Sequence, residues 1–131
     1  LLVKDAVHAL LAVGLDPYQG LFHRLRYGRP SLALDLAEEF RPLVADSVVL
    51  GLVNNRTITW SDFIRRGRAF ALNEQARRRV IRAYEARMDT LIRHPLFGYQ
   101  VSYRRVLEVQ ARLLARAIAG EIPTYRPFTT R

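Results

Sequence analysis

A histidine and two carboxylates in one short stretch of the chain have the composition of a divalent-metal site. Asp35 and Glu38 are three residues apart, so in a helix they lie on the same face. His23 comes earlier, before a Gly-Arg-Pro-Ser break that separates it from that helix. One imidazole and two carboxylates, in a chain without cysteine, suit Mn²⁺ or Mg²⁺. Because many arginines lie nearby, such an ion would act on a phosphodiester.

The spacing of these three residues also fits ordinary structural roles. His23 could be a turn residue packed against Phe22. Asp35 and Glu38 could be solvated helix residues, since carboxylates near a helix start are stabilised by the helix dipole. Spacing alone therefore leaves a metal site and an acidic helix surface both open.

The charge of the chain predicts an anionic partner. There are 21 lysines and arginines against 12 aspartates and glutamates, a net charge of +9, and Lys4 is the only lysine. Guanidinium groups suit phosphate because they donate hydrogen bonds in pairs. A compositional bias without functional meaning would produce the same excess of arginine, and this alternative stays open.

The composition excludes several classes of protein. The chain has no cysteine, which rules out disulfides and zinc–thiolate sites. No apolar run reaches about 18 residues, so we expect no membrane span. Half of the residues are hydrophobic, which is typical of a globular domain. We expect a single domain over residues 1–131 with an extended tail over 121–131.

Hydrophobic periodicity predicts an all-α fold. The expected helices cover residues 1–13, 32–54, 74–93 and 99–119. Gly14 should end the first helix, and Pro42 should kink or split the second. The apolar second half of the 32–54 helix is expected to be the central core helix.

The segment between the second and third expected helices is the only place where we expect strand-like structure. Residues 57–60 resemble a strand, and the apolar residues of 63–72 suggest a small hairpin or packed loop. Trp60, the only tryptophan, is expected to anchor the core.

Two stretches of the chain resemble a known protein family. They are Gly14-Leu15-Asp16-Pro17-Tyr18 through Gly20-Leu21-Phe22-His23, and the run from Arg29-Pro30-Ser31 through Asp35-Leu36-Ala37-Glu38-Glu39-Phe40-Arg41-Pro42. They are similar to the catalytic-domain signature of the CRISPR-associated integrase. The resemblance implies a helical C-terminal catalytic domain in which His23, Asp35 and Glu38 are the catalytic metal ligands, for Mn²⁺ or Mg²⁺.

The resemblance also implies an activity and partners. The reaction would be a metal-assisted transesterification that inserts new spacers into a CRISPR array. The partners would be double-stranded DNA from protospacer and repeat, a second copy in a homodimer, and a small ferredoxin-like CRISPR-associated protein. The location would be the cytoplasm of a prokaryote.

The missing initiator methionine and the uncapped helix at Leu1 suggest a fragment truncated at its N-terminal side. Family members carry an upstream β-rich dimerisation domain and a further glutamate ligand. We therefore expect the parent to be an active endonuclease and integrase, and this fragment alone to be weak or inactive.

The arginines expected to contact DNA lie near the metal candidates or on one face of the third helix. They are Arg24, Arg26, Arg29, Arg41, Arg77 and Arg78. Arg41 is equally placed to pair with Glu38, and a solvated helix face is the alternative for Arg77 and Arg78. Two rival functions remain: a non-catalytic, Arg-rich helical DNA-binding module, and a helical interaction domain whose basicity only reflects composition.

Overall fold

The computed structural model describes residues 1–18 and 31–129. Its α-helices are α1 (Leu2–Ala12), α2 (Ser31–Phe40), α3 (Asp46–Asn54), α4 (Glu74–Met88) and α5 (Tyr103–Ile118). Short helical segments are the π-helical turn Arg41–Ala45 and the 3₁₀ turn Trp60–Asp62. Strands are β1 (Phe63–Arg66), β2 (Ala69–Leu72), β3 (Leu91–Arg93) and β4 (Gln100–Ser102).

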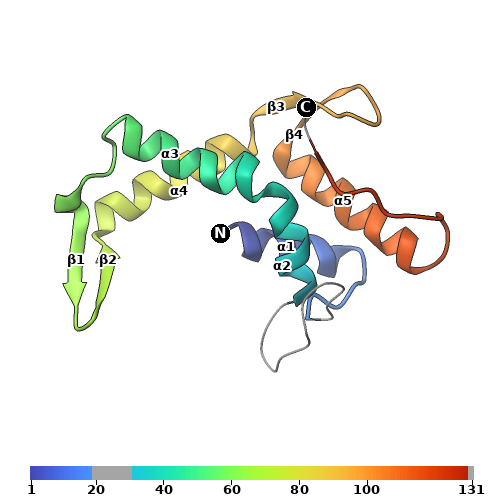
Figure 1. The fold of residues 1–131 in the computed structure, drawn as a ribbon, viewed down its shortest axis with the longest axis horizontal. Helices are drawn as coiled ribbons and strands as arrows, with labels where there is room; N and C mark the ends of the chain where they lie inside the picture. The colour runs from blue at the N-terminus through green and yellow to red at the C-terminus, as the bar shows by residue number, and fades with distance from the viewer. Residues whose placement is uncertain (19–30, 130–131) are drawn as a thin grey trace.

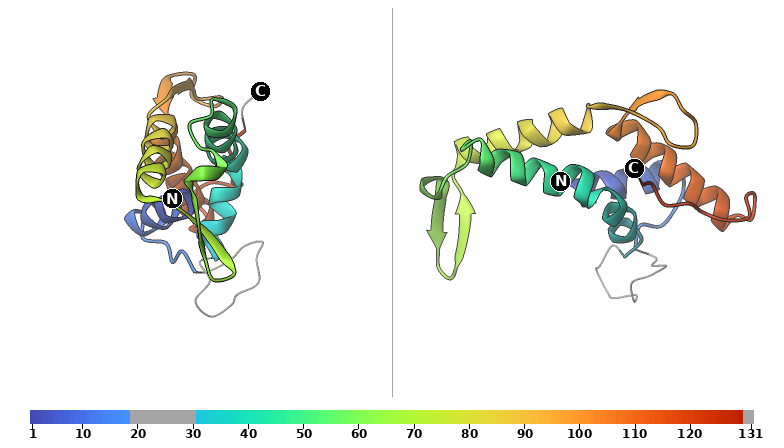
Figure 2. Two further views of the ribbon diagram at one scale, coloured as in Figure 1. Left: turned by 90° about the vertical axis from the view of Figure 1, so that its left-hand side faces the viewer. Right: turned by 45° about the horizontal axis from the view of Figure 1, so that its top comes forward.

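The molecule is elongated, with a helical body at one end and a β-hairpin at the other (Figure 1). Helix α1 packs against α2 and α5 in the body. Helices α3 and α4 run side by side away from it and carry the β1–β2 hairpin at their far ends (Figure 2).

The expectation of an all-α fold is wrong, because two small antiparallel sheets are present. In the first, β1 pairs with β2 from Phe63↔Leu72 to Arg66↔Ala69, around a turn in which Gly67 has φ +61°. In the second, β3 pairs with β4. The hydrophobic periodicity predicts the residues of β3 and β4 to lie at the end of helix 74–93 and at the start of helix 99–119. The chain reverses between them through Pro95 and Gly98, which favour turns over helix.

The first helix ends where the sequence predicts. Gly14 has φ +83°, and the Leu15 amide beyond it donates to the Leu10 carbonyl at 3.0 Å. This left-handed turn is the common helix stop for which glycine has no steric cost. Leu2, Ala6 and Leu10 are buried along one side of α1, and this spacing is the expected apolar stripe.

Pro42 divides the predicted 32–54 helix, as expected. The π-helical turn Arg41–Ala45 separates α2 from α3, because proline has no amide hydrogen to donate within an α-helix. The prediction that the second half is the central core helix is wrong. Only Leu52 of α3 is buried, while Val49, Leu50 and Val53 are exposed.

The core lies where α1, α2, α4 and α5 meet, and the tail completes it. Phe40 of α2 is fully buried and stacks on Phe128 of the tail, with ring centroids 5.4 Å apart. The tail therefore packs on the body over its last described residues. Trp60 lies outside this core and is 90% exposed, so the expectation that it anchors the core is wrong.

Within residues 1–18 and 31–129, no helix is long and apolar enough to cross a membrane.

Candidate functional site

Helix α2 carries the two candidate carboxylates. Its buried residues are Ser31, Leu32, Ala33, Leu36, Ala37 and Phe40. Asp35 is partly buried and Glu38 is exposed, so both lie away from the fully buried face. The prediction that these residues share a helix at a spacing of three is confirmed. Oxygens on neighbouring turns of one helix can reach a common ligand.

The start of α2 is fixed against the segment that follows α1. The Pro17 carbonyl accepts hydrogen bonds from the amides of Leu32 at 2.9 Å and Ala33 at 3.1 Å. The Tyr18 amide donates to Asp16 Oδ1 at 2.9 Å. The two bonds to the Pro17 carbonyl satisfy amides at the helix start that have no partner within the helix. They also place Pro17 beside the first turn of the helix that carries Asp35.

Four predicted site residues, His23, Arg24, Arg26 and Arg29, lie outside the described residues. The convergence of His23 with Asp35 and Glu38 therefore stays a prediction. Among residues 1–18 and 31–129, no three histidine, aspartate or glutamate side chains gather as a metal site.

Arg41 lies beside Glu38, as helical spacing predicts. Its Nε is 3.9 Å from Glu38 Oε2, and both side chains are well exposed. An exposed pair at this distance contributes between about 0 and 1 kcal/mol. Arg41 can therefore turn toward another anion at little cost.

Arg77 and Arg78 are not brought to the carboxylates. Both lie exposed in the first turns of α4, next to the β1–β2 hairpin. Arg78 Nε is 3.6 Å from Glu74 Oε1. Their role as DNA contacts stays a prediction, and it would require DNA that reaches along the molecule.

Other arginines have structural roles that the sequence did not reveal. Arg87 donates to the Leu43 carbonyl at 2.8 Å, and its guanidinium lies 4.9 Å from the centroid of the Tyr103 ring. Arg104 pairs with Glu85 and Asp89, and these hydrogen bonds and charges raise its pKa. Part of the arginine excess therefore stabilises contacts within the chain.

Glu39, next to Glu38, belongs to a different network. Its Oε1 accepts from the Phe128 amide at 2.8 Å and lies 3.3 Å from Gln110 Nε2. Its Oε2 accepts from the Tyr125 hydroxyl at 2.6 Å. Burial raises the pKa of Glu39, and these three donors oppose the rise. No local pattern around Glu39 indicates this network, because its partners lie 71 to 89 residues away.

The chain is basic, and its helix α2 carries the two candidate carboxylates, Asp35 and Glu38. Comparison with known proteins identifies the family of the chain. The sequence profile described as "CRISPR associated protein Cas1" matches residues 1–86. The chain belongs to the Cas1 family.

Curated Cas1 relatives are similar over the whole chain. A CRISPR-associated exonuclease Cas4/endonuclease Cas1 fusion from Geobacter sulfurreducens is 53% identical over 131 residues. CRISPR-associated endonuclease Cas1 3 from Thermus thermophilus is 50% identical over the same length. The chain spans 23% of the first relative and 40% of the second.

Solved structures share the fold. A casposase bound to integration product matches 99% of this chain with a TM-score of 0.88 and 24% identity, over 38% of its own length. A Cas1 protein from Thermotoga maritima matches 91% of this chain with a TM-score of 0.84 and 28% identity, over 36% of its own length. A Cas6-RT-Cas1–Cas2 complex matches 99% of this chain with a TM-score of 0.82 and 20% identity, over 14% of its chain.

Proposed function

We propose that this Cas1 chain carries the metal site of a DNA endonuclease and integrase that inserts new spacers into a CRISPR array. The observation that carries the proposal is the placement of Asp35 and Glu38 on α2 at a spacing of three. The net charge of +9 favours a polyanionic substrate such as DNA. Membership of the Cas1 family supports the activity, since the curated relatives are named as endonucleases.

The donor set fits Mn²⁺ or Mg²⁺. Carboxylate oxygens are the ligands that both ions favour, and the proposed imidazole of His23 tilts the choice toward Mn²⁺. When bound, either ion would supply a Lewis acid to a phosphodiester oxygen. In this assignment Asp35 and Glu38 hold the ion, and Arg41 binds the adjacent phosphate.

The reaction needs no nucleophile from the protein. A DNA 3′-hydroxyl oxygen forms a bond to the phosphorus of the repeat, and the bond from that phosphorus to the existing 3′-oxygen breaks. The proton of the attacking hydroxyl is balanced by the proton that the released oxygen gains. The residues of this chain bind and align the strands, which can supply a large part of the rate enhancement.

The partners follow from the same proposal. We assign double-stranded protospacer and repeat DNA as substrates, a second copy of the protein as a homodimer, and a small ferredoxin-like CRISPR-associated protein as partner. The Cas6-RT-Cas1–Cas2 complex, which contains a similar fold, is an assembly with a second protein and supports a protein partner for this chain.

The test is Mn²⁺-dependent strand transfer by the full-length protein that contains this chain. We expect His23→Ala, Asp35→Asn and Glu38→Gln each to reduce the rate by at least about a hundredfold with folding and DNA binding retained. Glu74→Gln is a matched control, because Glu74 is 64% exposed beside Arg78 as Glu38 is 58% exposed beside Arg41. Unchanged transfer in the three variants would leave a non-catalytic, Arg-rich DNA-binding module. If DNA binding also showed no dependence on salt concentration, the hypothesis of an Arg-rich DNA-binding module would be contradicted as well.

A further inference from the structure

The end of the molecule farthest from the body exposes aromatic and basic side chains together. We call this surface the hairpin tip, and it consists of Trp60, Phe63, Ile64, Arg65, Arg66, Arg68 and Phe70. Trp60 is 90% exposed and Phe70 is 69% exposed. Large apolar groups gathered on a surface commonly mark an interaction site.

The hairpin tip is strongly positive. Residues 63–72 contain three arginines and no acid. The nearest carboxylate, Asp62, is already engaged, because it accepts from the Thr59 amide at 2.8 Å and from Arg79 at 3.0 Å. These bonds lower the pKa of Asp62, and its charge is matched by Arg79. The charge of Arg65, Arg66 and Arg68 is therefore not matched within the hairpin.

The base of the hairpin, next to Trp60, is held in a defined position on α4. Arg79 donates to the Thr57 carbonyl at 3.1 Å as well as to Asp62. The Asn73 amide donates to the Asp62 carbonyl at 2.8 Å. The Trp60 ring lies 5.9 Å from the Phe63 ring, tilted by 48°. Trp60 and Phe63 therefore form an exposed aromatic pair that is supported by the fold.

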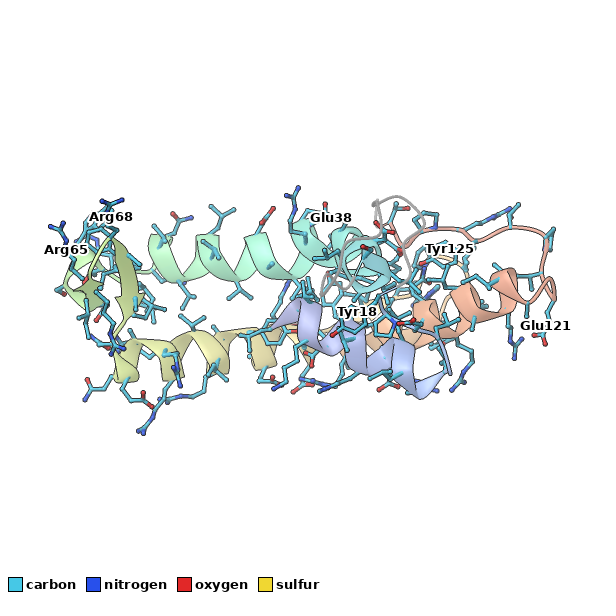
Figure 3. The ribbon with its side chains drawn as sticks, turned by 90° about the horizontal axis from the view of Figure 1, so that it is seen from below. Tyr18, Glu38, Arg65, Arg68, Glu121 and Tyr125 are labelled. Atoms are coloured by element: carbon cyan, nitrogen blue, oxygen red, sulfur yellow. The ribbon has the colours of Figure 1, made fainter. Side chains whose placement is uncertain are left out.

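Two arginines of the hairpin tip, Arg65 and Arg68, lie along the same edge of the molecule as Glu38 in one view of the structure (Figure 3). The segments Arg41–Ala45 and Asp46–Asn54 separate them. At a rise of about 1.5 Å per residue these two segments alone span about 20 Å, the length of about six base pairs of duplex. The hairpin lies beyond them, so its distance from Glu38 is greater than this.

From these observations we infer that the hairpin tip binds unpaired bases of a DNA strand, more than about six base pairs from the phosphate that Arg41 binds beside the proposed metal site. Arginines contact the backbone, and Trp60 and Phe70 stack on bases, which duplex DNA does not expose. This inference rests on the proposed function and adds to it a site for unpaired nucleotides away from the reacting 3′-hydroxyl. A second copy of the hairpin tip is disfavoured as the occupant, because it would bring arginines against arginines.

The position of the only tryptophan allows a direct test. Trp60 is the single tryptophan of these 131 residues, so its fluorescence reports on the hairpin tip once any tryptophan elsewhere in the full-length protein is changed to phenylalanine. We expect a single-stranded 15-nucleotide oligothymidine to quench this emission, and a blunt 15-base-pair duplex to quench it much less. Binding of the same DNAs, labelled with a dye, is followed in parallel by anisotropy.

Variants separate stacking from general hydrophobic contact. Trp60→Phe keeps an aromatic face and should retain most of the affinity for the single strand, whereas Trp60→Leu should lose about tenfold. Changing Arg65, Arg66 and Arg68 together to Gln should reduce the slope of log affinity against log salt by about 2. The same change at the exposed arginines Arg105, Arg112 and Arg116 of α5 is the matched control and should leave the quenching unchanged.

Three results would overturn the inference. The first is binding seen by anisotropy without quenching, which would place the DNA elsewhere and leave the proposed function intact. The second is equal affinity of Trp60→Leu and Trp60→Phe. The third is a change in emission that depends only on protein concentration, which would assign the hairpin tip to contact between copies. Failure of the proposed function is measured separately, as loss of metal-dependent strand transfer.

Discussion

The hydroxyl of Tyr125 donates a hydrogen bond of 2.6 Å to Glu39 Oε2, although the two residues are 86 positions apart. Gln110 Nε2 lies 3.0 Å from the same hydroxyl and 3.1 Å from the Arg126 carbonyl. The tail is thereby bonded to α2 one residue after Glu38. Burial raises the pKa of Tyr125, and the nearby Glu39 charge adds to the rise, so the phenol stays protonated and can donate.

Removing the hydroxyl should therefore destabilise the protein and release the tail. We expect Tyr125→Phe to lower the free energy of unfolding by about 1–3 kcal/mol, since a partly buried carboxylate loses a donor. Urea unfolding measures the change, and faster amide exchange at Phe128 would show the release. Tyr18→Phe is the control, because Tyr18 is exposed, and its effect should stay within about 0.5 kcal/mol. Equal effects of the two substitutions would contradict the role of this bond.

Stability should fall in mild acid because of His94. Its side chain is 1% exposed among Phe97, Tyr99 and Phe128, and its Nδ1 accepts from the Leu96 amide at 3.1 Å. Burial lowers the pKa of His94 below its ordinary 6.5, opposed by a weaker interaction with Gln110. Because the pKa of His94 is lower in the folded protein than in the unfolded chain, the unfolded chain takes up the proton first as the pH falls. The stability that neutral His94 contributes is therefore complete above pH 6.5, and it is lost as the pH falls through the pKa of the folded protein.

Urea midpoints at about pH 8 and pH 5.5 measure this contribution. In His94→Asn, whose side-chain oxygen can still accept the Leu96 amide, the loss between the two pH values should be smaller than in the parent. His8→Asn is the control, because His8 is exposed, and its pH dependence should match that of the parent. If His94→Asn lost as much stability between the two pH values as the parent does, the acid sensitivity would come from other groups.

Arg41 should matter for DNA and little for stability. The exposed pair of Arg41 with Glu38 at 3.9 Å should contribute less than about 1 kcal/mol to folding. We expect Arg41→Gln to leave the urea midpoint nearly unchanged, and to reduce the salt slope of duplex binding by about 0.9, the value for one phosphate contact. An unchanged slope would mean that Arg41 only braces Glu38.

Arg56 holds a backbone conformation that costs stability. Its φ is +55°, and the Thr57 amide beyond it donates to the Leu52 carbonyl at 2.9 Å, which ends α3. Glycine adopts this left-handed conformation without a Cβ penalty of about 1–2 kcal/mol. Arg56→Gly should therefore raise the free energy of unfolding by about 1 kcal/mol, measured in urea. Arg56→Ala keeps the Cβ and should give no such gain.

Local patterns in the sequence determined the helices and the relation between the two carboxylates. The helical period placed Asp35 and Glu38 on one helix, Pro42 predicted the break after it, and Gly14 predicted the end of α1. Each depends on residues within a few positions of one another, so proximity in sequence fixes proximity in space. The charge and the family resemblance likewise depend on residue types alone.

The tertiary structure decided which apolar residues form the core. Helix α3 is rich in valine and leucine, yet Val49 and Leu50 are exposed, because α3 leaves the body with α4 as its neighbour. Trp60 is exposed for the same reason, as it lies beyond the end of α3. The short strands β3 and β4 form only because the turn between them brings their edges together, and helical periodicity cannot detect this.

The Glu39 network shows most clearly what the sequence alone could not determine. Glu38 and Glu39 are adjacent and chemically alike, but the helix turns them to different surroundings. Glu38 faces solvent beside Arg41, whereas Glu39 meets Tyr125, Gln110 and the Phe128 amide. These partners come from α5 and the tail, and only packing brings them to α2. The sequence determined the residue types and their helical spacing, and the tertiary structure decided which carboxylate stays available for a ligand and which one supports the fold.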